Sequence, residues 1–344
     1  MEVRRITMQY RYLGKTGLKI SRISLGTQTF GWTTDKNEAF RMLDYYVAAG
    51  GNYLDSADSY NNGVSEEILG EWLKARNNAQ NLLIGTKVFF NEHAGPDSND
   101  IGHSRKHIVT SLERSLKRLG IEAVDLYQLH CYDRGTDIEL VVQIMEDLIR
   151  AGKILHYGIS NFTPSLIMKM LMLAQYKHYH QPVSLQLEYS LLVRSPEWEL
   201  LPLCEEEHIG TLAWSPLAGG WLTGKYRKNA PPPKNSRVGR RDREYDQPDK
   251  RDGERTWLII DELERIANQR NVPVSQVALN WMRKKKSISS ILIGARSMEQ
   301  LESNMACILW EMSDEETLVL DKVSKEKIPY PYSFINSYSR ESYL

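Results

Sequence analysis

Four side chains that can hold or move a proton follow three separate apolar stretches of this 344-residue chain. Asp55 and Lys87 each end such a stretch, His130 ends a third, and Tyr60 follows Asp55 in a predicted loop. An ammonium near a phenol favours its ionised form, so Lys87 beside Tyr60 would ease proton exchange with a substrate oxygen. His130 could donate a hydrogen bond to that oxygen. The same residues fit a structural ion pair beside a tyrosine that only lines a wall.

The stretches that carry these residues belong to a regular alternation of predicted strands and helices. Strands are predicted at 20–26, 53–56, 82–88, 124–130, 154–159, 183–187, 210–214 and 291–293. Helices are predicted at 37–49, 65–76, 104–119, 138–151, 164–176, 197–207, 256–270, 274–285 and 298–308. Strands joined through helices run parallel. Eight such units predict an α/β fold, a (β/α)8 TIM barrel formed as a single domain over 1–344, with an N-terminal hairpin at 8–23.

Polar residues gather where the predicted strands end. In a barrel of this kind the active site lies at the carboxyl ends of the strands. The residues found there are Asp55, Lys87, His130, Ser160, Asn161, Gln186 and Ser215. The fold therefore predicts that side chains far apart in the sequence share one opening.

The segment 227–255, after the seventh predicted strand, differs in composition from the rest of the chain. It contains three consecutive prolines at 231–233 and a dense mixture of acidic and basic residues. It fits a solvated, mobile insertion. It fits equally a lid whose arginines approach a phosphate-bearing ligand, because barrel enzymes often bind phosphate after this strand.

The composition excludes several classes of partner. Lysine plus arginine and aspartate plus glutamate number 44 each, so no net field attracts nucleic acid or an anionic membrane. No apolar run reaches the length needed to span a bilayer, and the N-terminus lacks the apolar core of a signal peptide. Three widely spaced cysteines predict neither disulfides nor a zinc site. We expect a cytoplasmic protein that acts on small molecules, with its oligomeric state open.

Five segments together resemble the signatures of the aldo-keto reductases. They are NYLDSADSY (52–60), GTK (85–87), DLYQLH (125–130), GISNF (158–162) and WSPLA (214–218). Their order matches that family, and Trp214 with the later GKY (224–226) is most similar to its branch of aryl-alcohol dehydrogenases and potassium-channel β subunits. The resemblance implies that Tyr60 is the general acid, tuned by Lys87 and Asp55, and that His130 orients the carbonyl.

The resemblance also implies that NADPH lies extended across the barrel mouth. This agrees with the absence of a Gly-x-Gly-x-x-Gly segment after a strand. Ser160, Asn161 and Gln186 would hold the nicotinamide carboxamide. Trp214 would stack on the nicotinamide ring, with Ser215 and Leu217 beside it.

Two further segments are predicted to contact the phosphates of this cofactor. GGWLTGKY (219–226) is similar to a nucleotide-binding P-loop, but tyrosine stands where magnesium binding needs serine or threonine. We therefore expect Lys225 at a pyrophosphate instead. Gly294 opens the last helix, where Arg296 suits the 2′-phosphate that distinguishes NADPH from NADH. Arg237 in the long loop is a second phosphate contact.

Near the adenosine, the resemblance places Gln300 and Asn304. Ser303 stands where the family has glutamate just before that asparagine, which leaves the preference for NADPH over NADH less firmly indicated. No metal site is predicted: His103 and His107 lie in a polar segment without a third ligand and are expected to be surface-exposed.

Aromatic residues of the predicted mouth loops would select the substrate. The candidates are Phe30, Trp32, Phe89, Phe90, Tyr132, Trp221, Tyr330 and Tyr332. They favour a planar, apolar carbonyl compound such as an aromatic aldehyde. The expected function is NADPH-dependent reduction of aldehydes or ketones. The alternative is an NADPH-binding, redox-sensing regulatory subunit of a membrane partner such as a potassium channel.

Overall fold

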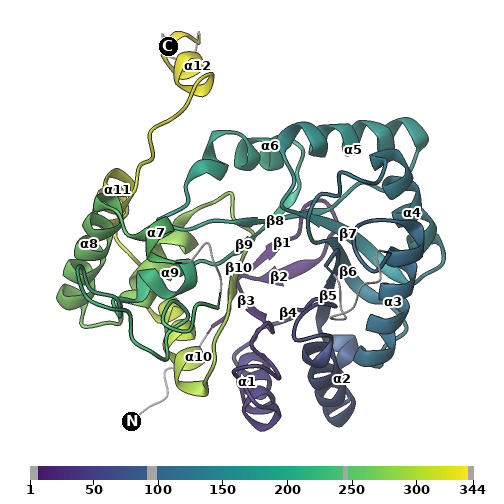
Figure 1. Cartoon of the computed structure of the whole chain (residues 1–344), viewed down its shortest axis with the longest axis horizontal. Helices are drawn as coiled ribbons and strands as arrows, with labels where there is room; N and C mark the ends of the chain where they lie inside the picture. The colour runs from purple at the N-terminus through teal and green to yellow at the C-terminus, as the bar shows by residue number, and fades with distance from the viewer. Residues whose placement is uncertain (1–6, 91–98, 243–246, 340–344) are drawn as a thin grey trace.

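Eight parallel strands close into a barrel in the computed structural model, which describes residues 7–90, 99–242 and 247–339. The strands are β3 (Ile23–Gly26), β4 (Tyr53–Asp55), β5 (Leu83–Val88), β6 (Val124–Leu129), β7 (Ile154–Ser160), β8 (Ser184–Glu188), β9 (Gly210–Trp214) and β10 (Ser290–Ile293). Each pairs with its neighbours along the chain, and β10 closes the ring on β3. The predicted (β/α)8 barrel is confirmed (Figure 1).

Helices surround the barrel and bury apolar side chains against the strands or against neighbouring helices, as α11 does on α8 (Figure 1). They are α1 (Lys36–Ala48), α2 (Val64–Arg76), α3 (Arg105–Leu119), α4 (Ile138–Arg150), α5 (Pro164–Lys177), α6 (Leu200–Glu206), α8 (Glu254–Arg270), α9 (Val274–Lys284), α10 (Met298–Met305) and α11 (Asp314–Val323). In α3, the Ser104 side chain accepts from the His107 amide, and Gly120 ends the helix with a positive φ. These local signals explain why the observed bounds of α3 agree with the predicted ones.

The prediction of a single strand over 20–26 is wrong, because the segment forms two strands. Its first part is β2 (Lys19–Ser21), which pairs antiparallel with β1 (Tyr10–Tyr12), and its second part is β3. The break falls at Arg22, whose buried guanidinium donates to the carbonyls of Arg283 (2.6 Å) and Ser289 (3.3 Å). Ile20 packs in the apolar cluster at the amino end of the barrel, so the hairpin covers that end.

The sequence suggested that the long segment after β9 is irregular throughout, but part of it is helical. It contains α7 (Pro248–Arg251), which follows the buried Gln247. Two predicted helices are also shorter than expected. The 197–207 segment divides into a 3-10 turn (Ser195–Trp198) and α6, and 298–308 becomes α10 followed by a 3-10 turn (Ala306–Leu309). Proline at position 202 favours the first of these breaks, because it has no N–H to donate to the carbonyl of residue 198, four positions earlier.

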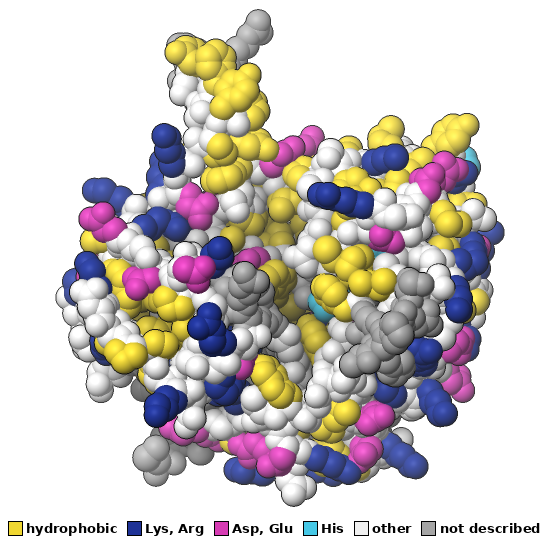
Figure 2. Space-filling view, in the orientation of Figure 1, with side chains coloured by type: hydrophobic (Ala, Val, Ile, Leu, Met, Phe, Trp, Pro, Cys, Tyr) yellow, Lys and Arg dark blue, Asp and Glu magenta, His cyan; other side chains and the backbone are white. Residues whose placement is uncertain are grey.

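The last helix, α12 (Tyr332–Tyr338), projects away from the barrel (Figure 1). Tyr332 donates to Glu199 and lies 6.2 Å from the ring of Trp198. The apolar side chains of this arm are largely exposed (Figure 2). Among the described helices, none is both long and apolar enough to cross a membrane.

The prediction that His103 and His107 are exposed is wrong, because both are buried between α3 and the loop after β5. His103 packs edge-on against Phe89, with ring centroids 5.4 Å apart, and burial lowers its pKa to about 4. In the described part of the chain, no three histidine, cysteine or acidic side chains gather as a metal site would require.

Candidate active site

A cavity of about 840 Å³ opens at the carboxyl ends of the strands. Figure 2 shows this face of the molecule hollowed near its centre. The cavity is lined by all the residues predicted for the site except Lys87: Asp55, Tyr60, His130, Ser160, Asn161, Gln186, Trp214, Ser215, Leu217, Lys225, Arg237, Gly294, Arg296, Gln300 and Asn304. Lys87 lies directly beneath it, bonded to two of them. The barrel thus brings the predicted residues together.

The buried end of the cavity is built on the ion pair of Asp55 and Lys87. Asp55 is the last residue of β4, Lys87 stands near the end of β5, and their charged atoms are 2.7 Å apart. The Lys87 side chain is fully buried. Burial alone would lower the pKa of Lys87, but the attraction of Asp55 and Tyr60 outweighs it and raises that pKa. Lys87 is therefore held as an ammonium.

All three protons of that ammonium have acceptors. Lys87 Nζ donates to Asp55 Oδ2 at 2.7 Å, to the Ser56 carbonyl at 2.6 Å and to the Tyr60 hydroxyl at 3.2 Å. Because an ammonium has no lone pair, Tyr60 accepts in the third bond and keeps its own proton for another partner. Tyr60 lines the cavity, so that proton can reach a molecule bound there.

His130 follows the strand next to that of Lys87, and its amide donates to the Val88 carbonyl at 3.0 Å. It follows β6, and its ring centroid is 5.9 Å from that of Tyr60 and 4.9 Å from that of Phe90. The Asn161 amide donates to the His130 carbonyl at 2.9 Å. Asn161 has a φ of +59°, a conformation that asparagine tolerates better than most residues. One face of His130 and the Tyr60 hydroxyl therefore border the same space.

A layer of polar side chains beneath Asp55 was not predicted from the sequence. Asp55 Oδ1 accepts from Tyr53 (3.1 Å), Gln128 (3.1 Å) and Gln186 (2.9 Å). Only Gln186 had been singled out, as a polar residue near the end of a predicted strand. Tyr53 and Gln128 lie inside strands, where an inward polar side chain is indistinguishable from an outward one without the barrel register.

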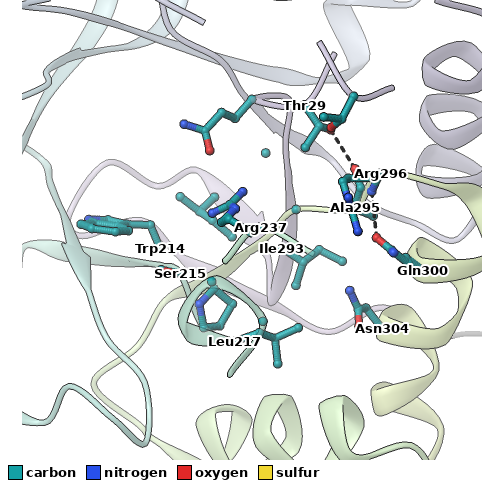
Figure 3. A pocket seen from close by; sticks show the side chains of 18 of the residues that line it. Thr29, Trp214, Ser215, Leu217, Arg237, Ile293, Ala295, Arg296, Gln300 and Asn304 are labelled. Atoms are coloured by element: carbon teal, nitrogen blue, oxygen red, sulfur yellow. Dashed lines mark hydrogen bonds between the residues drawn. The ribbon is translucent and has the colours of Figure 1, made fainter. Parts of the chain in front are cut away.

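At the other side of the cavity, Trp214, Ser215 and Leu217 line the wall where β9 gives way to the long loop (Figure 3). The backbone there turns through positive φ at Ser215 (+55°) and Ala218 (+47°). Such conformations are costly for residues with a Cβ and cluster at binding sites. The turn exposes the backbone of Gly219 and Gly220 to the cavity.

Four basic side chains surround this part of the cavity: Lys225, Arg237, Arg240 and Arg296. Desolvation by the surrounding protein, followed by repulsion from the three arginines, lowers the pKa of Lys225 to about 8. The Lys225 side chain is exposed at the rim of the cavity. Among the described residues, neither Lys225 nor Arg296 forms a salt bridge with a carboxylate. Two of the four cations thus lack a carboxylate partner in the described part of the chain, which suits an anionic ligand.

The amino end of α10 completes the wall (Figure 3). Ser297 caps the helix by accepting from the Gln300 amide, and Gln300 accepts from the Arg296 amide at 3.0 Å. Arg296 also donates to the Asn235 carbonyl at 2.8 Å, which ties the long loop to this helix. Arg237 and Arg240 of that loop reach the cavity, as the lid interpretation expects, and Arg240 was not predicted individually.

Only two of the predicted substrate-contacting aromatics line the cavity, Trp32 and Phe90. Phe30 and Trp221 are buried in the core, where Trp221 packs against Tyr226 and Trp257. The other four lie outside the lining: Phe89 packs on His103, Tyr132 on Phe162, and Tyr330 and Tyr332 belong to the projecting arm. Those predictions were wrong because sequence position does not show which way a loop side chain turns.

Comparisons with known proteins agree with this geometry. The chain is 35% identical to a probable voltage-gated potassium channel subunit beta of Arabidopsis thaliana, over 94% of this chain and 100% of the relative. It is 33% identical to the uncharacterized oxidoreductase YrpG of Bacillus subtilis (92% and 96%) and 32% identical to the Protein tas of Escherichia coli (92% and 97%). The sequence profile of the aldo/keto reductase family matches residues 22–325, so the chain belongs to the aldo/keto reductase family.

Proposed function

We propose that this protein reduces aldehydes or ketones to alcohols with NADPH, and that Tyr60 gives the proton. Membership of the aldo/keto reductase family supports oxidoreductase activity on carbonyl compounds. The observation that carries the finer proposal is the bonding of Lys87, whose third proton goes to the Tyr60 hydroxyl at 3.2 Å. That bond leaves the phenol proton directed towards the cavity and stabilises the phenolate that remains after transfer.

The other residues of the buried end have supporting roles in this proposal. Asp55 holds the ammonium in place through its 2.7 Å bond to Lys87. His130 borders the same space as the Tyr60 hydroxyl and would donate to the carbonyl oxygen, fixing it for the incoming proton. Two donors aimed at one oxygen stabilise the negative charge that develops on it during reduction.

The remaining cavity fits a phosphate-bearing nicotinamide cofactor. When bound, NADPH supplies the hydride for the carbonyl carbon. Lys225 and Arg237 would face its pyrophosphate, and Arg296 its 2′-phosphate. Ser160, Asn161, Gln186, Trp214, Ser215, Leu217, Gly294, Gln300 and Asn304 would hold the remaining parts. The support is the cluster of basic groups: desolvation and then repulsion from the neighbouring arginines lower the pKa of Lys225 to about 8, and a bound anion would relieve the repulsion.

Trp32 and Phe90 support the choice of a planar apolar substrate. Both are exposed and line the cavity, Phe90 beside His130 and Trp32 beneath Arg240. Aromatic side chains at a binding site contribute large apolar contact areas. We therefore propose aromatic aldehydes as the first compounds to examine.

The test follows the loss of NADPH absorbance with a panel of aromatic and aliphatic aldehydes, for the wild type and for Tyr60→Phe. Loss of a general acid lowers turnover by about 10²–10⁴-fold. Tyr60→Phe keeps the ring and should bind NADPH as the wild type does. Equal turnover by the two proteins would refute the role of Tyr60.

A second candidate is an NADPH-binding, redox-sensing regulatory subunit of a membrane partner such as a potassium channel. It is favoured by the similarity to the Arabidopsis protein named above. Such a protein would oxidise bound NADPH in a single turnover and then retain the product. Comparing single-turnover with steady-state rates separates the two: equal rates support the enzyme, and a steady state slower by several orders of magnitude supports the sensor.

A further inference from the structure

The proposed reaction depends on Asp55, and the side chains that hold Asp55 come from inside the barrel. Tyr53 lies two residues before it on β4, Gln128 is on β6 and Gln186 on β8. All three are buried: Tyr53 is 1% exposed, Gln128 0% and Gln186 3%. Their polar ends meet at one atom, Asp55 Oδ1, at 3.1, 3.1 and 2.9 Å.

The chemistry of the carboxylate fixes how each neighbour is oriented. An ionised carboxylate can only accept, so both glutamine amides must present their nitrogen to it and Tyr53 its hydroxyl proton. The second proton of Gln128 Nε2 then goes to the Tyr53 oxygen (3.3 Å), and that of Gln186 Nε2 to Gln128 Oε1 (3.2 Å). Every donor in this layer is used, which makes it rigid.

Two glycines of neighbouring strands leave space for the Tyr53 and Gln128 side chains. A Cβ at Gly85 would overlap the Tyr53 phenol, and one at Gly158 would press on Gln128. Burial and the neighbouring Asp55 raise the pKa of Tyr53 well above its usual value, so its hydroxyl stays a donor. Tyr53 and Gln128 do not line the cavity, whereas Gln186 does. They can therefore act only through Asp55 and Gln186.

We infer that Tyr53 and Gln128 are positioning residues for the proton transfer: they orient the Asp55 carboxylate, which in turn holds the Lys87 ammonium against Tyr60. Because three donors fix Oδ1, the other oxygen is turned towards Lys87. Without them the carboxylate can rotate, and the Lys87–Tyr60 bond is lost. The layer also consumes both protons of Gln186, so only its carbonyl oxygen can serve a cofactor carboxamide, as an acceptor from the carboxamide nitrogen.

This inference rests on the proposed function, and the test separates the two. Tyr53→Phe and Gln128→Met remove the donors with little change of volume. Tyr157→Phe is the matched control, because Tyr157 is a fully buried barrel tyrosine whose hydroxyl donates to the His180 carbonyl at 3.1 Å instead. Each protein is measured for kcat, KM for the aldehyde and Kd for NADPH by quenching of tryptophan fluorescence.

We expect kcat to fall by about tenfold or more in Tyr53→Phe and in Gln128→Met, as for a lost hydrogen bond to a charged group. KM should stay within about twofold in both variants, since neither residue lines the cavity, and so should the NADPH Kd in Tyr53→Phe, because Tyr53 forms no hydrogen bond with the cofactor-facing Gln186. In an Asp55→Asn background Gln128→Met should have no further effect on kcat, because the two residues act as one unit. An equal loss of kcat in Tyr157→Phe, additive losses, or weaker NADPH binding in Tyr53→Phe would each overturn the inference.

A crystal structure of Gln128→Met gives a readout that needs no turnover. The inference predicts that Lys87 Nζ lies beyond hydrogen-bond distance of the Tyr60 hydroxyl in the variant, and an unchanged bond would overturn it. If the wild type reduced no carbonyl compound, the proposed function would be refuted, and this structure would still decide whether Tyr53 and Gln128 position Lys87.

Discussion

The two ends of the cavity handle charge in opposite ways. At the buried end, Lys87 is paired with Asp55 and each of its protons has an acceptor. At the rim, Lys225 and Arg296 have no carboxylate partner among the described residues, and repulsion from the neighbouring arginines contributes to the lowered pKa of Lys225. The first end is complete before any ligand arrives, while the second is stabilised only when an anion binds. Removing a cation should therefore cost stability at the buried end and affinity at the rim.

The largest expected effect is on stability at the buried end. Lys87→Met leaves the Asp55 carboxylate buried without its counter-charge, which costs about 3–5 kcal/mol of unfolding free energy. Urea unfolding measures it. The double variant Asp55→Asn with Lys87→Met should recover most of that loss, because it removes the unpaired charge and keeps an oxygen that can accept from Tyr53, Gln128 and Gln186. If Lys87→Met were as stable as the wild type, the buried end of the cavity would not depend on its cation as this comparison requires.

The next effect is on cofactor choice at the rim. Arg296→Ala should weaken NADPH binding by about 10–100-fold, the value of a hydrogen bond between charged groups, and leave NADH binding unchanged. Fluorescence titration with both cofactors measures this. Equal losses for NADPH and NADH would show that Arg296 does not contact the 2′-phosphate.

A third effect depends on pH. The pKa of Lys225 is about 8 in the free protein, and a bound phosphate would raise it, so binding takes up a proton above pH 8. NADPH affinity should then fall as pH rises above about 8, by at most about tenfold per pH unit, and hold steady below it. Lys225→Met should remove this slope and change stability by no more than about 0.5 kcal/mol. A slope that persists in the variant would assign the titration to another group.

The smallest effect is expected at Arg240. This side chain already pairs with Asp242 and lies over the Trp32 ring at 5.7 Å, so part of its charge is compensated. Arg240→Gln should weaken NADPH binding by only about two- to threefold, within the range of an exposed ion pair. A loss as large as that of Arg296→Ala would show that the Asp242 pair opens when the ligand binds.

The sequence was sufficient to identify site residues at the ends of strands, but not those inside strands. Asp55, Lys87 and His130 could be found because apolar runs stop at them and the carboxyl ends of parallel strands share one edge. Tyr53 and Gln128 could not, since inward and outward positions differ only by the register of the closed barrel.

Burial of individual side chains was also beyond the sequence. His103 lies in a polar segment yet is buried against Phe89, and Trp221 fills the core although its neighbours form a loop. The break at Arg22 depends on carbonyls contributed by residues near 283–289. These are contacts between distant parts of the chain, which local pattern does not contain.

The full use of the Lys87 protons has a consequence for the catalytic cycle. On the proposed mechanism Tyr60 gives up one proton in each turnover and must regain one. A route through the barrel interior would have to begin at solvent, but Lys87 beneath Tyr60 spends its other two protons inside the protein and, like Tyr53 and Gln128, is buried away from water. The replacement proton must therefore enter from solvent through the mouth. Tyr60 can thus be reprotonated only after the alcohol has left. A product that stays bound keeps Tyr60 deprotonated.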